Sequence, residues 1–555
     1  MNDLSRLFEN ARDNSVIELE KDRVYHVKPE DSFVKTGYFC SNTAKRHENP
    51  GGTRYCAIFL EDKKNITIRG NGAEICVHGK MTPLLFSRCD NITVENLAVD
   101  YFCPTMTEFK ILSNNNGICE FKVNRECLFD IDGKDLILKG ETAENGKPYW
   151  QGKTYGQGRF IKIFNPETRL TRDFRRETLE FKKAERISED TFRAELIYKD
   201  ADFPVGHIIQ SRNIVRDQTG SFFERCKNLQ FRNIRMKFMH GLGIVSQFCE
   251  NVKFENCDFT PGEGRTVAST ADFFQFSGCK GKLYLDNIKA WGAHDDYVNV
   301  HGTHLRIIRK NKRKKTITVR FMHPESWGFQ AFEKGDTLEF IKWNTLAPFG
   351  KTEVLSYEKL NDTDIRLYLT NLNDNIEVGK DVVENATWTP DLYVRNCNFG
   401  TTSGRGILCT TRGEVVIENN VFDSLWGPAL LLEDDCNFWF ESGYTKKVVF
   451  RNNIVKQCEH AAMWKGAPVI RYSPKVMDEN SAHFVHGELV VTGNTFQKPK
   501  EDKHLFYLTY LAKAEITDNI FDSPYEIKTH HTGEITEKNN KIKEAPLCKG
   551  SCQRS

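Results

Sequence analysis

A short strand-like motif recurs along most of this chain and constrains its fold more than any other feature. The motif alternates apolar and polar residues and closes on asparagine, as in NITIRGNGAEI at Asn65, NVKFENCDF at Asn251 and KVVFRNNIV at Lys447. Successive copies lie 23 to 26 residues apart, for example Asn65 to Asn91 and Asn228 to Asn251. Such alternation has the period of a β-strand, and repeats of this length stack on one another. The sequence therefore predicts an all-β fold, a parallel β-helix solenoid.

Asparagine and cysteine both support this register. Asparagine tolerates left-handed backbone conformations, so it suits the tight bend that ends each strand. Equivalent positions on stacked coils form a line with steps of about 4.8 Å, and a line cannot surround one tetrahedral metal ion. We therefore expect a ladder of buried thiols at the four cysteines that stand two residues before a matching strand: Cys89, Cys226, Cys249 and Cys279.

Two long stretches interrupt the repeat and predict inserted β modules. Residues 105–215 and 303–388 contain hairpin-like runs such as FKILSNNNGICEFKV and LRIIRKNKRKKTITVRF. We expect each stretch to form a small β-barrel or β-sheet that leaves the solenoid and returns to it. The solenoid itself would then comprise residues 1–104, 216–302 and 389–545, followed by a polar tail at 546–555.

Composition narrows the partners and the compartment. Lys and Arg total 78 against 76 Asp and Glu, and this balance argues against nucleic acid as a partner. The sequence contains no run of 18 or more apolar residues, so it predicts no membrane span. The 17 cysteines include no CxxC pair, which favours free thiols in a reducing compartment. Because no signal-peptide pattern is visible, we expect a cytoplasmic protein, or a secreted or periplasmic one if a leader was trimmed. The sequence does not distinguish a monomer from a homodimer.

Acidic residues that could perform catalysis concentrate in TADFFQFSGCKGKLYLDNIKAWGAHDDYVNVHG, residues 270–302. Asp272 and Asp295 are 23 residues apart, one coil as measured elsewhere, and Asp296 follows. We therefore expect the carboxylates on adjacent coils, about 4.8 Å apart along the axis. Their repulsion should raise at least one pKa, and glycosidic hydrolysis needs a protonated acid beside a carboxylate base. The alternative is that Asp272 caps a turn and the acidic pair lies on a solvated loop.

Several motifs resemble glycoside hydrolase family 110, the exo-acting α-1,3-galactosidases, from Val24 to about residue 540. They are TADFFQFSGCKG, GAHDDYVNVHGTHL, HPESWGF, SGRGIL, VVIENNVF and EDDCNFWFESG. The resemblance implies a right-handed parallel β-helix with inserted barrel modules. It implies an inverting hydrolase that removes terminal α-1,3-linked galactose, such as that of blood-group B structures, without a metal or other cofactor. It also implies that Asp295 is the general acid and that Asp272 and Asp296 hold and activate water.

Polar and aromatic residues near these motifs are candidates for binding a galactose-terminated glycan. His294, Asn299 and His301 lie beside the acidic pair and could hydrogen-bond sugar hydroxyls or the backbone. Arg265 could lower the pKa of Asp272 or be a surface charge.

The remaining candidates lie later in the chain. Glu433 and Asp434 could bind sugar hydroxyls or cap a coil. Trp439 could stack on a sugar or lie in the core.

Two other functions use the same fold. A polysaccharide lyase or uronate epimerase usually relies on a Lys, Arg or Tyr base with Ca²⁺ or an acidic substrate. A non-catalytic carbohydrate-binding solenoid would not need three clustered aspartates.

Overall fold

Strands make up nearly all of the regular structure in this computed structural model. A short helix, α1 (Asp3–Glu9), buries Leu4 and Phe8 at the N-terminal end of the molecule. No helix within the described ranges has the length and apolar character needed to cross a membrane. The expected polar tail at 546–555 lies outside the described residues, which are 2–124, 126–154, 159–173, 179–198, 202–213, 215–460, 468–497 and 504–543.

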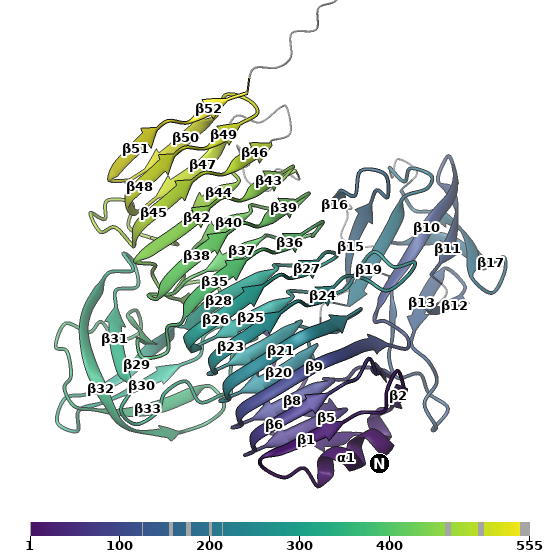
Figure 1. Cartoon of the computed structure of the whole chain (residues 1–555), viewed down its shortest axis with the longest axis horizontal. Helices are drawn as coiled ribbons and strands as arrows, with labels where there is room; N and C mark the ends of the chain where they lie inside the picture. Colours follow the sequence, from purple (N-terminus) through teal and green to yellow (C-terminus); the bar gives the residue numbers. More distant parts are fainter. Residues whose placement is uncertain are drawn as a thin grey trace, which may run out of the picture.

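Parallel strands stack coil upon coil along the molecule (Figure 1). In one long sheet, β9 (Asp90–Tyr101) pairs in parallel with β6 (Lys64–Arg69) on one side and with β21 (Lys227–Met236) on the other. A second long sheet runs from β5 (Ile58–Glu61) to β50 (Glu526–His530). Apolar side chains from both sheets form one continuous core. The predicted parallel β-helix is confirmed.

Asparagines occupy two kinds of position at the coil bends, one exposed and one buried. Asn419 and Asn452 are exposed and adopt left-handed φ angles of 58° and 54°, as the bend requires. The residue after each one, Asn420 or Asn453, is buried, and Nδ2 of Asn420 donates to Oδ1 of Asn453 at 3.0 Å. Nδ2 of Asn453 also donates to the carbonyl oxygen of Ile417 at 3.0 Å. An internal amide row thus supplies hydrogen bonds to buried backbone, and it continues through Asn494, Asn519 and Asn540.

The predicted thiol ladder is confirmed. Its four cysteines occupy equivalent positions on successive coils, and all are free and buried. The backbone N–H of Cys89 donates to Sγ of Cys226 at 3.4 Å.

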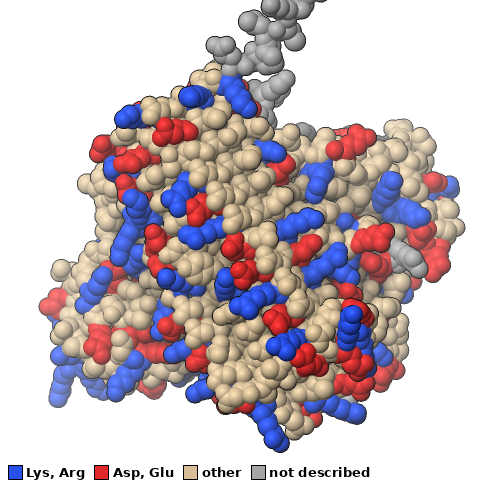
Figure 2. All heavy atoms as spheres, viewed as in Figure 1, with Lys and Arg blue, Asp and Glu red and all other residues tan. Residues whose placement is uncertain are grey.

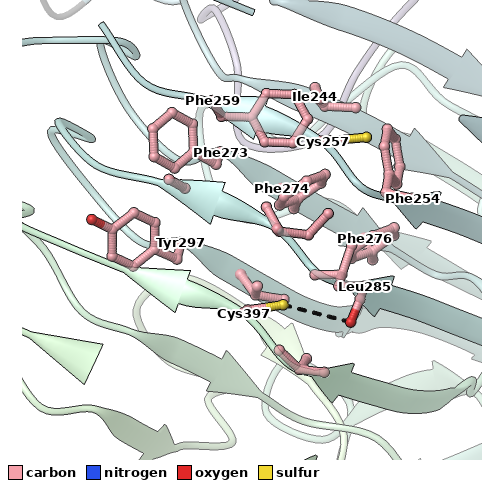
Figure 3. Close-up of a cluster of buried hydrophobic side chains, with 14 of the residues drawn as sticks. Ile244, Phe254, Cys257, Phe259, Phe273, Phe274, Phe276, Leu285, Tyr297 and Cys397 are labelled. Atoms are coloured by element: carbon pink, nitrogen blue, oxygen red, sulfur yellow. Dashed lines mark hydrogen bonds between the residues drawn. The ribbon is translucent and has the colours of Figure 1, made fainter. Parts of the chain in front are cut away.

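Aromatic rings also stack inside the coils, with the centroids of Phe273 and Tyr297 5.4 Å apart (Figure 3). These rings fill the interior beneath the loops that precede β25 (Phe274–Ser277).

Two β modules leave the solenoid on opposite sides in Figure 1. The first is an antiparallel sheet that includes β10 (Met106–Asn115), β15 (Arg159–Phe164) and β19 (Ile208–Asn213), and it has its own apolar core. The second is a closed barrel that begins with β29 (Leu305–Asn311) and ends with β34 (Val382–Asn385). These are the inserted β-sheet and β-barrel expected from the sequence, while the domain boundaries stay predictions.

The barrel contacts the solenoid through a buried ion-pair network. Arg412, from the solenoid, donates from Nη2 to Oε2 of Glu339 at 2.5 Å and also to Glu384. All three side chains are buried. On the outer face in Figure 2, by contrast, basic and acidic side chains intermingle in solvent, where an ion pair contributes little to stability.

Candidate active site

Strand residues of the second sheet, such as Gln275 on β25, and neighbouring loops line a cavity of about 480 Å³, a size that suits a small-molecule ligand. Segments far apart in the sequence meet there, including the segment that follows the first module. Most of the lining side chains are polar or charged. The lining residues are Asn42, Arg216, Asp272, Gln275, Asp295, Asp296, Asn299, Arg405, Leu408, Thr410, Glu433, Asp435, Phe438, Trp439, Glu441 and Lys475.

The three predicted carboxylates converge in this cavity, but with a register different from the expected one. Strand β25 pairs in parallel with β28 (Val298–Thr303), with Phe274 opposite Val298, so this coil spans 24 residues. Asp272 therefore lies opposite Asp296, whose backbone N–H donates to Asp272 Oδ1 at 3.2 Å. Asp272 and the acidic pair therefore lie on adjacent coils, as expected, and the coil between them is one residue longer than the 23 residues expected from the spacing. Each of the three still offers an oxygen within 4.8 Å of the others.

Arg405 occupies the same register position on the next coil, because β28 pairs with β37 (Ile407–Cys409) and sets Val298 opposite Ile407. Its Nε donates to Asp296 Oδ1 at 2.5 Å and its Nη2 to Oδ2 at 2.7 Å. The same Nη2 lies 3.4 Å from Asp295 Oδ1. A bidentate guanidinium of this kind fixes a carboxylate and stabilises its charge.

A second arginine reaches the cavity from the segment that follows the first module. Arg216 follows β19, and its Nη2 donates to Asp295 Oδ2 at 3.1 Å. Its Nη1 donates to the carbonyl oxygen of Asn42 at 3.2 Å. Arg212, on β19, donates to the carbonyl oxygen of Thr270 just before Asp272. The end of the first module and the segment that follows it therefore supply positive charge near the carboxylates.

These contacts separate the pKa values of the carboxyl groups. Burial, reinforced by the charges of Asp295 and Asp296, raises the pKa of Asp272 well above its usual range. Burial also raises the pKa of Asp296, to about 7, against the opposing effect of Arg405. Burial acts on Asp295 as well, but the guanidinium groups of Arg405 and Arg216 outweigh it and lower the pKa of Asp295. At neutral pH these shifts favour a protonated Asp272 and an ionised Asp295.

Three of the seven candidate binding residues line the cavity. Asn299 is buried beside the carboxylates on β28, and Glu433 accepts a hydrogen bond from Lys475 Nζ at 2.6 Å. Trp439 is 46% exposed, and its ring stacks on His323 with centroids 4.3 Å apart. The exposed face of this indole is available to a ligand.

Two candidates lie behind the cavity wall. Asp434 is buried and hydrogen-bonds His304 Nε2 at 2.8 Å, which ties its loop to the start of the barrel. His301 is buried and its Nε2 lies 2.6 Å from Gln275 Nε2, so it contacts a lining residue without lining the cavity itself.

The structure does not bring the last two candidates to the cavity. Arg265 donates from Nη2 to Asp100 Oδ2 at 2.6 Å, so its charge is neutralised at another position on the solenoid. His294 is buried, and its Nε2 hydrogen-bonds Gln210 Oε1 of the first module at 2.8 Å. Both residues join segments of the fold.

Sequence reasoning missed the two arginines. Arg405 lies in SGRGIL, and aligning this motif with AHDDYV would have set it opposite Asp296. Its neighbour Gly404 is a further signal, because a Cβ there would lie 2.3 Å from the carbonyl carbon of Asp295. Arg216 and Asn42 come from segments with no repeat spacing to the acidic motif, so no sequence signal indicates them.

Known proteins match both the barrel and most of the chain. The family model described as GLAA-B beta-barrel domain II matches residues 316–383. The protein named alpha-1,3-galactosidase A from Bacteroides fragilis is 33% identical over 487 residues, which are 85% of this chain and 76% of that protein. The protein of the same name from Akkermansia muciniphila is 33% identical over 464 residues, 82% of this chain and 73% of that protein.

Among solved structures, a mutant tailspike protein of E. coli bacteriophage HK620 in complex with a pentasaccharide aligns with 95% of this chain and 59% of its own. Its sequence identity is 10% and its TM-score 0.40.

Proposed function

Because this chain belongs to glycoside hydrolase family 110, the α-1,3-galactosidases, we propose that it removes terminal α-1,3-linked galactose from glycans with inversion of configuration. The observation that carries this proposal is the convergence of three carboxylates and two arginines in one cavity. Substrates of this class include branched blood-group B structures and linear α-1,3-galactose glycans.

We assign the role of general acid to Asp295. Its side chain is 27% exposed whereas that of Asp296 is fully buried, so Asp295 is the carboxyl group that a glycosidic oxygen can approach. Asp272 and Asp296 lie deeper on adjacent coils, and two neighbouring carboxyl groups are suited to bind one water molecule and accept its proton. The leaving oxygen would take its proton from Asp295 while that water attacks the anomeric carbon.

This assignment requires a proton to move when the substrate binds. In the free site Arg216 and Arg405 lower the pKa of Asp295, although burial opposes them. A sugar that enters the cavity displaces water and can take over the contact of Arg216 with Asp295, which would favour the protonated form. We propose that a proton then moves from Asp272 or Asp296 to Asp295, which neutralises Asp295 and leaves the donor ionised as the base.

A hydrolysis assay tests the activity against the other two functions. The protein is incubated with p-nitrophenyl α-galactoside, a branched B-type oligosaccharide and a linear α-1,3-galactosyl trisaccharide. Release of free galactose supports the proposal. An unsaturated product that absorbs in the ultraviolet would indicate a lyase, an epimerised but uncleaved sugar an epimerase, and binding without turnover a carbohydrate-binding solenoid.

Proton NMR during early turnover tests the stereochemistry. Inverting enzymes usually hold their two carboxyl groups about 6.5–9.5 Å apart and retaining enzymes about 5–5.5 Å. Here the nearest oxygens lie within 4.8 Å of one another, so spacing alone does not select inversion, and the family resemblance supports it instead. We expect β-galactose to form first from an α-linked substrate. Initial α-galactose would contradict inversion.

A further inference from the structure

Two histidines and a cysteine cluster at the N-terminal end of the solenoid, on segments that do not line the catalytic cavity. His26 lies on β2 (Val24–Val27), directly opposite Cys76 on β7 (Glu74–Val77). His78 follows β7, two residues after Cys76, and therefore lies on the same face of the strand. Each of the three offers one nitrogen or sulfur atom within 4.8 Å of the other two.

The ring of His78 is held in a defined orientation. Its Nδ1 lies 3.0 Å from Oε1 of Glu141, and the same oxygen accepts the backbone N–H of Gly79 at 3.0 Å. The ring of Phe102 stacks on that of His78, with centroids 4.6 Å apart. A neutral imidazole that donates from Nδ1 to this carboxylate carries its lone pair on Nε2, and Nε2 of His78 lies 3.0 Å from Nδ1 of His26. A carboxylate that accepts from the far nitrogen is typical of metal-binding histidines.

We propose that His26, Cys76 and His78 bind a zinc ion. Two imidazole nitrogens and a thiolate are donors that Zn²⁺ prefers. Zn–N bonds of about 2.0–2.1 Å in tetrahedral geometry separate two nitrogens by about 3.3 Å, close to the 3.0 Å between the two rings. His26 is exposed, so water can occupy the fourth position. Zn²⁺ binding releases the thiol proton of Cys76 to solvent.

The ion would link three parts of the fold. Strand β2 belongs to the N-terminal coil, β7 to the coil that follows, and Glu141 to the first module. A ligand that binds the folded protein stabilises it, so zinc would stabilise the end of the solenoid where the chain begins.

Metal titration of the full-length, untagged protein tests the site after chelator treatment. Competition with a chromophoric chelator should show one equivalent of tightly bound Zn²⁺, and Co²⁺ should give a thiolate charge-transfer band. Cys76→Ala should abolish the cobalt band. Cys76→Ala, His78→Ala and His26→Gln should each weaken Zn²⁺ binding at least about tenfold, and Glu141→Gln about 10- to 100-fold.

Two matched controls locate the metal. Cys119→Ala removes another buried free thiol, and Asp296→Asn alters the other cluster of potential ligands; both should bind Zn²⁺ as the wild type does. Three results would overturn the proposal: no stoichiometric binding by the folded wild type, unchanged binding by both His26→Gln and His78→Ala, or loss of binding in Asp296→Asn. Because His26 is exposed, His26→Gln keeps the test valid even if the Cys76 variant fails to fold.

Discussion

At the scale of single residues, each of the three carboxylates has different partners. Asp296 is held by Arg405 in a bidentate pair, and Asp295 contacts both Arg405 and Arg216. Asp272 instead accepts the backbone N–H of Asp296. Neighbouring acids whose pKa values are driven apart can serve as acid and base in one reaction. The partners, more than the aspartates themselves, therefore set which group holds the proton.

Replacing the proposed acid should affect substrates unequally. Asp295→Asn should lower kcat at least about 100-fold on an α-1,3-linked disaccharide, because the departing sugar needs a proton. The loss should be smaller on p-nitrophenyl α-galactoside, whose leaving group needs little protonation. Steady-state kinetics on both substrates measures the difference, and equal losses would exclude Asp295 from this role.

Removing the charge of Arg216 should change the pH dependence. Arg216 helps to lower the pKa of Asp295, so in Arg216→Gln the limb of the kcat/KM profile governed by Asp295 should move to higher pH by about one unit. Arg46→Gln, which alters an arginine outside the cavity, serves as the control and should leave both limbs in place. A profile that is unchanged, or displaced to lower pH, would show that Arg216 does not act on the acid.

Asp272 should cost the protein stability at alkaline pH. Burial raises its folded-state pKa above the unfolded value of about 3.9, so its stabilising effect is complete below that value and is lost as pH rises through the folded pKa. Asp272→Asn stays neutral. Its melting temperature relative to wild type should therefore be higher at pH 8 than at pH 5, while activity is lost. The exposed Asp374→Asn should show no such gain at pH 8, and equal behaviour of the two variants would contradict the assignment.

At the scale of elements, the repeat reveals the coils but not their lengths. The strand motifs and left-handed asparagines such as Asn251 are visible in the sequence because each coil needs them. The residues between motifs vary, since a loop can lengthen without disturbing the stacked strands. The coil from Asp272 to Asp296 has 24 residues rather than 23, and only strand pairing shows which aspartate faces which. The three carboxylates were predictable as a cluster, but their register was not.

Substitutions in the buried amide row should lower the free energy of unfolding more than substitutions at the bends beside it. Asn453→Ala removes the acceptor of the buried backbone N–H of Asn420 and the donor to the carbonyl oxygen of Ile417. Each unsatisfied group costs about 1–3 kcal/mol, so the free energy of unfolding should fall by at least about 2 kcal/mol. Asn452→Gly should change it by less than about 0.5 kcal/mol, because glycine adopts the same left-handed bend. Denaturant unfolding measures both, and similar values would show that the row carries no special stability.

At the scale of the whole molecule, the insertions were predictable but their contribution to the site was not. A break in the repeat shows where a module leaves the solenoid. Its contacts depend on three-dimensional docking, which brings Arg216 beside Asp295 and Gln210 beside His294. These pairs are 79 and 84 residues apart in the chain, and no periodicity relates them. The first module and the segment that follows it therefore make contacts at the cavity and beside it.

The barrel should depend on its buried arginine. Arg412→Ala leaves Glu384 buried without its cation, which costs about 3–5 kcal/mol for such pairs. Adding Glu384→Gln should recover part of the loss. Arg366→Ala, which breaks an exposed pair with Glu358 in the same barrel, should have little effect; an equally large effect there would contradict the prediction.

The spread of the cavity residues along the chain also has a consequence in time. The residues that line the cavity extend from Asn42 to Lys475. Because ribosomes add about 5–20 residues per second, roughly 20 to 90 seconds separate the synthesis of the first lining residue from that of the last. Coils can fold as they emerge, because each contacts mainly its neighbours. A nascent chain can therefore contain folded coils before its cavity is complete. We expect substrate binding and catalysis only after Lys475, the last lining residue, has been synthesised.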